Sequence, residues 1–184
     1  MNLATQLDQF REENVYFCES IRNNIMTEGN FIRILYSNQF ITFNGVYLLI
    51  HLLENFNESP STLSSSLSHF NKFKCTFNTT IHKEIINQIK VIEDSILSKV
   101  NIINKTKLYK IHEQLCTGNV KLFTDTSANH GQAHVNTTSS SSSSFILKIS
   151  GIWETKYQYG LTFKFLPMKE IFLSSSSCSH PSVV

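Results

Sequence analysis

The sequence predicts an α+β fold in which a small antiparallel β-sheet or barrel carries an inserted amphipathic helical pair. Short β-branched and aromatic segments predict the strands, and one region with an apolar residue at every third or fourth position predicts the helices. With 184 residues, 41% of them apolar and 16% charged, the chain is sized for one packed domain. We expect this domain at 15–173, after a polar lead-in at 1–14 and before a disordered tail at 174–184.

The first strands are predicted at 15–20 and 31–36, where β-branched and aromatic residues gather. Residues 44–45 are Asn-Gly, which favours a tight turn because both residues tolerate positive φ. We therefore expect 40–43 and 46–50 to fold back on each other as a hairpin. A later strand is predicted at 70–77, where apolar and lysine residues alternate and leave one face in water.

Isoleucines spaced three or four residues apart predict an amphipathic helix over 81–100. A second helix is predicted over 105–117, with Gly118 placed for a left-handed C-terminal cap. Together they form a helical insertion at 79–117. Ile85, Ile89 and Ile92 are expected to be buried.

A strand is predicted at 119–125, followed by a serine-rich linker at 126–144. The linker lacks apolar periodicity, so we expect it to be mobile. Two further strands, at 145–154 and 159–165, give the densest β signal in the chain.

No motif predicts catalysis, so we expect no enzyme activity and no cofactor. His112 and Cys116 have a spacing that can chelate zinc, but a structural site needs four ligands and no second pair has metal spacing, so no metal site is predicted. No apolar run reaches the length of a membrane span, so no membrane partner is expected. The four cysteines lie far apart and no secretory signal is found, which favours an intracellular protein, in cytoplasm or nucleus, with reduced thiols.

Charge is distributed unevenly along the chain. Residues 1–59 hold three basic and seven acidic residues, whereas 60–184 hold thirteen and seven. In the basic part, strand lysines stand beside aromatic residues, as in proteins that combine a basic groove with rings on which bases stack. The alternative is that the aromatic residues are core and the lysines face water, since exposed lysines on strands are common edge protection.

Several segments resemble known proteins: Phe31-Ile32-Arg33-Ile34-Leu35-Tyr36-Ser37, Phe43-Asn44-Gly45-Val46-Tyr47, Tyr109-Lys110-Ile111-His112-Glu113-Gln114-Leu115, and Leu147 to Phe165 around Gly151-Ile152-Trp153-Glu154. The pattern resembles small proteins of large DNA viruses and related mobile elements, some of which look like single-stranded-DNA-binding proteins. The resemblance implies an OB-like barrel, a five-stranded Greek key. It implies single-stranded DNA as partner and identifies no functional residue.

The leading hypothesis is a non-catalytic protein that binds single-stranded nucleic acid. Its expected phosphate contacts are Arg33, Lys72, Lys74, Lys148 and Lys164. Its expected stacking residues are Phe31, Tyr36, Trp153, Tyr157 and Tyr159. The alternative is a protein-interaction or structural module, in which the helical pair at 81–117, and the stripe of helix 81–100 above all, packs on a partner or on a second copy of the chain.

Overall fold

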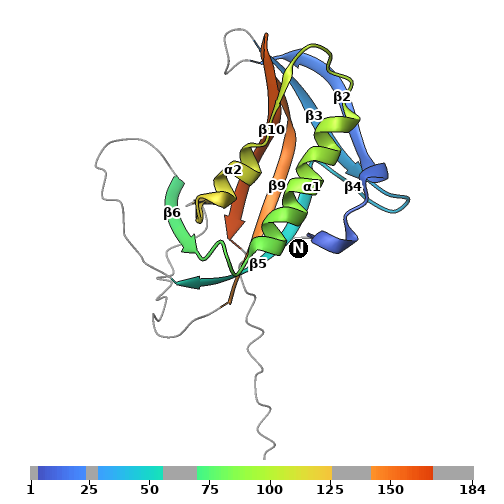
Figure 1. The fold of residues 1–184 in the computed structure, drawn as a ribbon. Coiled ribbons are helices and arrows are strands. Elements are labelled where there is room, and N and C mark those ends of the chain that lie inside the picture. The colour runs from blue at the N-terminus through green and yellow to red at the C-terminus, as the bar shows by residue number, and fades with distance from the viewer. Residues whose placement is uncertain (1–3, 24–28, 56–69, 126–141, 168–184) are drawn as a thin grey trace, which may run out of the picture.

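A computed structural model describes residues 4–23, 29–55, 70–125 and 142–167, without the side chains of 53–55, 70–74, 123–125, 142–143 and 167. These ranges form a ten-stranded mixed sheet and two α-helices (Figure 1). The elements in chain order are β1 (Thr5–Gln6), β2 (Val15–Arg22), β3 (Asn30–Ser37), β4 (Thr42–Phe43), β5 (Val46–Asn55), β6 (Phe70–Phe77), α1 (Lys83–Lys99), β7 (Thr106–Leu108), α2 (Lys110–Cys116), β8 (Asn119–Asp125), β9 (Ser142–Glu154) and β10 (Gln158–Pro167). The predicted α+β class is confirmed.

The sheet is mixed rather than antiparallel, which corrects the prediction. Its order is β1-β5-β6-β8-β10-β9-β3-β2, and β1–β5, β7–β10 and β8–β10 are parallel pairs. Because β5 also pairs with β9, five strands are linked in a cycle of pairings. Two junctions of that cycle are short in the described residues: β8 meets β10 at Leu122–Phe165, and β5 meets β6 at Glu54–Phe77 and Asn55–Thr76. The sheet is therefore open, and it is not a closed barrel.

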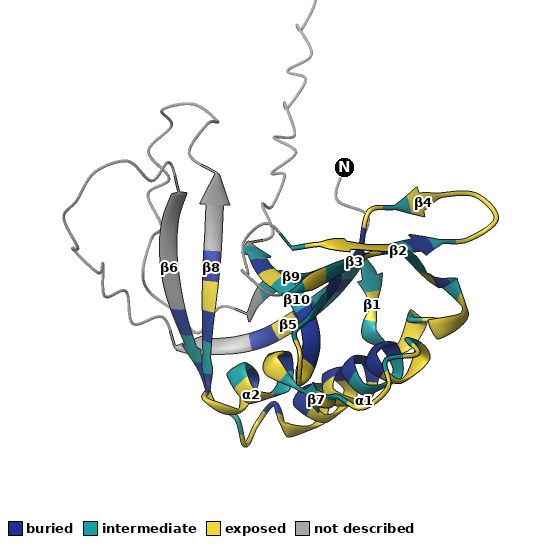
Figure 2. Cartoon of the chain, turned by 90° about the horizontal axis from the view of Figure 1, so that it is seen from above, coloured by how far each residue is buried: buried dark blue, intermediate teal, exposed yellow. Residues whose placement is uncertain are grey.

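Helix α1 covers the core side of the sheet, together with α2 (Figure 2). Ile89 is 1% exposed, Ile92 is buried, and Ile85 packs half-buried against the same core. The amphipathic stripe that predicts the helix is thus covered by the sheet of its own chain. The predicted burial is confirmed for Ile89 and Ile92, whereas Ile85 is only half-buried.

The second helix is shorter than predicted and begins at Lys110. Thr106–Leu108 instead forms β7, because the free edge of β10 at Gln158–Gly160 offers parallel pairing. Gly118 has φ +68°, as expected for the residue that follows the helix.

Glu93 of α1 joins the two helices. Its carboxylate is fully buried and accepts the backbone N–H groups of Ile111 (3.1 Å) and His112 (2.9 Å) at the start of α2. Burial raises the pKa of Glu93 above its usual value, although the two N–H donors partly offset that effect. The first N–H groups of a helix have no hydrogen-bond partner within the helix, and at the start of α2 Glu93 accepts two of them.

The predicted hairpin at Asn44-Gly45 is wrong. Gly45 does take a positive φ of +109°, but β4 pairs with β3 through Tyr36–Phe43, and β5 pairs with β9 from Val46–Ile149 onward. Pairing with β9 gives β5 a long ladder of backbone hydrogen bonds, whereas the two-residue β4 could pair with only two residues of β5. The tight turn lies earlier, where the Asn38 side chain accepts the N–H groups of two following residues.

The serine linker ends earlier than expected, because Ser142 to Ser144 begin β9. Pairing with β5 orders these serines, and Ser144 Oγ lies 2.8 Å from His51 Nδ1. Residues 126–141 and the tail from 174 lie outside the described residues, as do residues 1–3 of the lead-in. The rest of that lead-in forms β1 and two short 3₁₀ turns. No helix in the described residues is long and apolar enough to cross a membrane.

Candidate nucleic-acid interface

The strands at the centre of the sheet have one face toward the helices and one away from them (Figure 2). In β3, Ile32 and Ile34 are buried in the core, whereas Phe31 and Arg33 alternate with them and are not. In β10, Leu161 and Phe165 are buried and Lys164 is exposed. We call the side of β3, β5, β6, β8, β9 and β10 that lies away from the core the outer face.

A bulge in β9 changes which of its residues reach the outer face. Thr162 pairs with Gly151 and Phe163 pairs with Ile149, so Ser150 has no opposite residue in β10. The extra residue reverses the alternation of β9. Lys148 and Trp153 therefore both lie on the outer face although they are five residues apart.

The register places charged residues in one row across the strands. Lys148 of β9 stands opposite Lys164 of β10. Because Phe165 pairs with Leu122 in the parallel β10–β8 pair, Lys164 has Lys121 of β8 as its neighbour. Lys121 in turn stands opposite Lys74 of β6. We call these four positions the lysine row.

The lysine row is unfavourable for the fold itself. Like charges at opposite positions of neighbouring strands are destabilising. Lysines that protect a sheet from aggregation stand on edge strands, but β8, β9 and β10 lie inside the sheet order. Edge protection therefore does not explain the row.

Two aromatic rings of the outer face lie over glycines, farther along β9 and β10 from the lysine row. A Cβ atom on Gly151 would come within 2.3 Å of the Phe31 ring, and one on Gly160 within 2.9 Å of the Trp153 ring. Phe31 and Trp153 stand opposite each other, and both are half-buried. Each ring covers the backbone of the adjacent strand and keeps part of its surface exposed to solvent.

Two cations of the outer face, Arg33 and Lys148 of the lysine row, contact neighbouring side chains. Arg33 is exposed, and its Nη1 donates to Asn44 Oδ1 at 3.0 Å. Lys148 Nζ lies 4.9 Å from the centre of the Tyr47 ring, a cation–π contact. These contacts position both charges on the surface.

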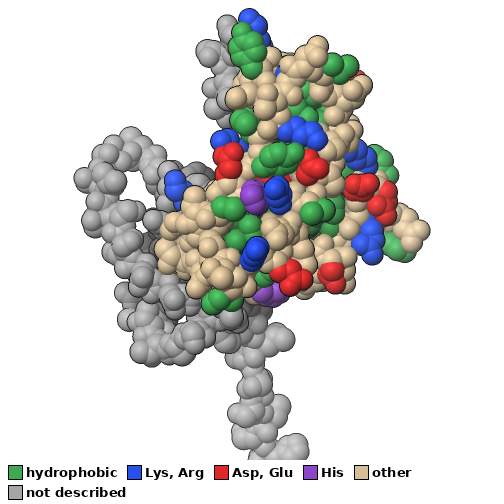
Figure 3. Space-filling model, in the orientation of Figure 1, with side chains coloured by type: hydrophobic (Ala, Val, Ile, Leu, Met, Phe, Trp, Pro, Cys, Tyr) green, Lys and Arg blue, Asp and Glu red, His purple; other side chains and the backbone are tan. Residues whose placement is uncertain are grey.

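No carboxylate lies on the outer face in the described residues of β3, β9 and β10. Glu154 stands opposite the buried Tyr159 and forms an ion pair with Lys105 on the helix side. The helix side itself carries acidic and basic side chains interspersed (Figure 3). Its ion pairs include Lys107–Asp94 at 3.2 Å and Lys110–Glu113 at 2.7 Å. On the described residues of β3, β9 and β10, the outer face differs from the helix side in having basic groups without acidic ones.

Tyr36 and Tyr159, expected to stack on bases, are core residues instead, with 6% and 3% of their surface exposed. The Tyr36 hydroxyl accepts the N–H of Arg11 at 3.1 Å, and the Tyr159 hydroxyl donates to the carbonyl of Leu97 at 3.4 Å. Residues an odd number of positions apart on a regular strand point to opposite faces of the sheet. Tyr36 is three residues from Arg33, and Tyr159 is five from Lys164, so both tyrosines point into the core.

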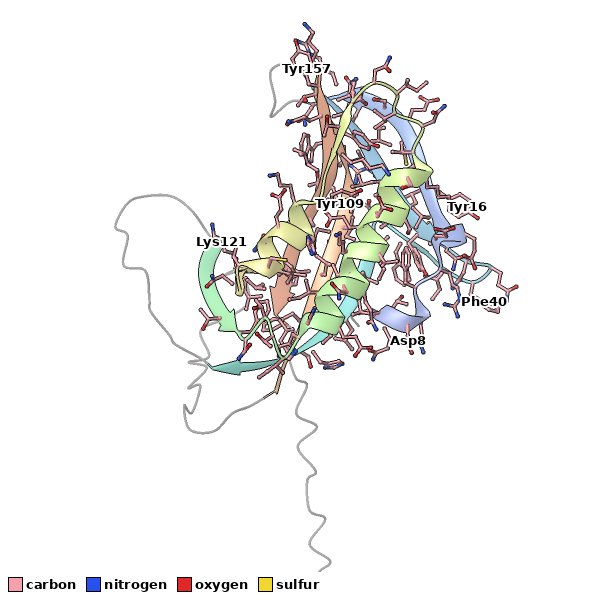
Figure 4. All side chains as sticks on the ribbon, viewed as in Figure 1. Asp8, Tyr16, Phe40, Tyr109, Lys121 and Tyr157 are labelled. Carbon is pink, nitrogen blue, oxygen red and sulfur yellow. The ribbon has the colours of Figure 1, made fainter. Side chains whose placement is uncertain are left out.

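The remaining predicted residues lie apart from the two rings. Tyr157 is 68% exposed at the tip of the β9–β10 hairpin, where Lys156 Nζ lies 5.1 Å from its ring centre (Figure 4). Lys72 and Lys74 belong to β6, opposite Phe123 and Lys121, and their side chains lie outside the described part.

Three residues of this surface are not predicted from the sequence: Asn44, Tyr47 and Lys121. Each is identified by its contact or its register with a neighbouring strand, and not by the residues next to it in the sequence. Only the alternation of Lys121 with the apolar Val120 and Leu122 could have marked it as an outward lysine.

On the helix side, a polar cluster surrounds Asp94. The hydroxyl of Tyr109 (2.7 Å) and the ammonium group of Lys107 both donate to Asp94 Oδ1 (Figure 4 labels Tyr109). These bonds hold the pKa of Asp94 below its usual value, and the bond to Asp94 raises the pKa of Tyr109 to about 12. The cluster ties α1 to the segment that leads into α2.

His112 Nε2 lies 3.4 Å from Cys116 Sγ. Within the described ranges no group of three or more His, Cys, Asp or Glu side chains is placed to hold a metal ion.

Compared with known proteins, the chain matches no family model, no curated protein and no solved structure.

Proposed function

We propose that this protein binds single-stranded nucleic acid, DNA above all, on its outer face. The lysine row carries the proposal, because Lys148, Lys164, Lys121 and Lys74 stand side by side on neighbouring strands without intervening acidic residues. Such a row is unfavourable in the free protein and favourable when a phosphate backbone lies across it.

The residues of the outer face divide into two roles. The lysine row and Arg33 contact phosphates, and each contact releases counterions from the strand. Phe31, Trp153 and Tyr157 offer ring surface on which bases stack. Lys72, next to the row on β6, is a further phosphate contact.

The OB-like interpretation of the fold belongs to the same proposal. An OB domain is a five-stranded, partly open barrel that binds oligonucleotides across its second and third strands. The cycle β5-β6-β8-β10-β9, with two short junctions, supports that arrangement. Its second and third strands in chain order are β6 and β8, which hold Lys74 and Lys121 at opposite positions.

The first test is binding itself. A mixed-sequence oligonucleotide of about 30 nucleotides is expected to bind at low salt and to quench the emission of Trp153, the only tryptophan. Trp153→Ala should weaken binding by roughly 1–3 kcal/mol without changing the salt dependence, since stacking releases no counterions. Trp153→Phe, which keeps a ring over Gly160, should lose less binding affinity than Trp153→Ala.

Two results would count against this account. If the oligonucleotide binds but leaves the emission of Trp153 unchanged, that ring only covers Gly160. If no oligonucleotide binds at low salt, by fluorescence and by gel shift alike, the proposed function is wrong.

A further inference from the structure

Among the side chains that the structure describes, one aromatic ring of the outer face lies directly beside the lysine row. Tyr47 of β5 stands opposite Lys148 and is half-buried, with the ring of Phe43 6.1 Å away and tilted by 58°. Trp153, in contrast, lies five residues along β9 from Lys148, a distance of about 15 Å. Tyr47 is therefore the ring that a nucleotide can reach while its phosphate contacts the row.

In the free protein the face of Tyr47 is already occupied. Lys148 Nζ lies 4.9 Å from the ring centre, where the ring attracts a cation. A base cannot stack on that face while the ammonium group covers it. The neighbouring Lys164 is exposed and makes no such ring contact among the cation–π pairs of the described residues.

We propose that Tyr47 is a stacking residue of the nucleic-acid interface and that Lys148 leaves its ring face when a base stacks there. The released ammonium group then contacts the adjoining phosphate. This inference rests on the proposed function and adds to it an exchange of partners at one residue pair. Lys148 and Lys164, although opposite each other in the sheet, therefore make different contributions to binding.

The difference is measurable as a function of salt. Lys148→Ala and Lys164→Ala each remove one phosphate contact, so each should flatten the slope of log K against log[salt] by roughly 0.7. Lys148→Ala also frees the Tyr47 ring. Extrapolated to about 1 M salt, where the ionic contribution vanishes, it should bind about two- to fivefold more tightly than wild type. Lys164→Ala should show no such gain.

The ring itself is tested by substitution. Tyr47→Ala should weaken binding about five- to a hundredfold, and Tyr47→Phe, which keeps a ring, should lose less. A tryptophan reporter guards against loss of folding: in the Tyr47→Trp/Trp153→Phe variant, an oligothymidine of about 30 nucleotides should quench the emission of the single tryptophan.

The outcomes separate the two proposals. Absence of binding by wild type overturns the proposed function. Three results overturn the role of Tyr47 alone. The first is a binding affinity that Tyr47→Ala leaves unchanged, and the second is a tryptophan reporter that remains unquenched. The third is a Lys148→Ala affinity below that of wild type at every salt concentration, including the extrapolation to about 1 M.

Discussion

Replacing Lys121, Lys148 and Lys164 together by alanine is expected to weaken binding of single-stranded DNA on the order of a few hundredfold at about 50 mM salt. Each lysine lost removes one phosphate contact, so the salt slope should flatten by roughly 2 in total. The loss should be the same for every base sequence tested, because phosphate contacts carry no sequence information. Titrations at several salt concentrations measure both quantities.

The same triple variant should be at least as stable as wild type. It removes like charges that stand opposite each other on β9, β10 and β8. A denaturation midpoint equal to or above that of wild type would show that the loss of binding is not loss of folding.

The matched control removes the same charge from the helix side. Lys83, Lys90 and Lys110 are exposed residues of α1 and α2, and their replacement by alanine should leave the salt slope within about 0.3 of wild type. If this control loses as much affinity as the lysine-row variant, binding depends on net charge alone and the outer face has no special role.

Ile89→Ala is expected to destabilise the protein by about 2–4 kcal/mol, the largest stability effect of any single substitution considered. Ile89 is 1% exposed between α1 and the sheet, and truncation leaves a cavity that the packed core cannot fill. Val91→Ala, on the same helix but 68% exposed, should change stability by less than about 0.5 kcal/mol. Urea unfolding measures both. A cost below about 0.5 kcal/mol for Ile89→Ala would mean that α1 does not seal the core.

Sequence reasoning locates most strands and the long helix, because apolar periodicity depends on burial alone. The isoleucine stripe places α1 within two residues, and the alternation at Phe73, Cys75 and Phe77 places β6. What it misses is decided by partners far along the chain. β4 joins β3 rather than β5, and β7 forms only because β10 leaves an edge open.

The candidate site shows the same division. Phe31 and Arg33 share a face by simple alternation, and this rule alone also separates Tyr36 from them. Lys148 and Trp153 share a face only because of the bulge at Ser150, which no local residue preference predicts. Predicting the lysine row would require the register of four strands at once. Lys121 becomes a candidate binding residue only because Lys74 and Lys164 stand beside it on the neighbouring strands.

The most direct test of the outer face uses the wild-type protein and the reactivity of its lysines toward acetylation, read by mass spectrometry. When a single-stranded oligonucleotide saturates the protein, Lys121, Lys148 and Lys164 should lose reactivity because phosphates cover them. Lys83 and Lys90 of α1 should react as they do in the free protein. Protection of the α1 lysines with unchanged reactivity at Lys121 and Lys164 would place the nucleic acid on the helix side and contradict the account.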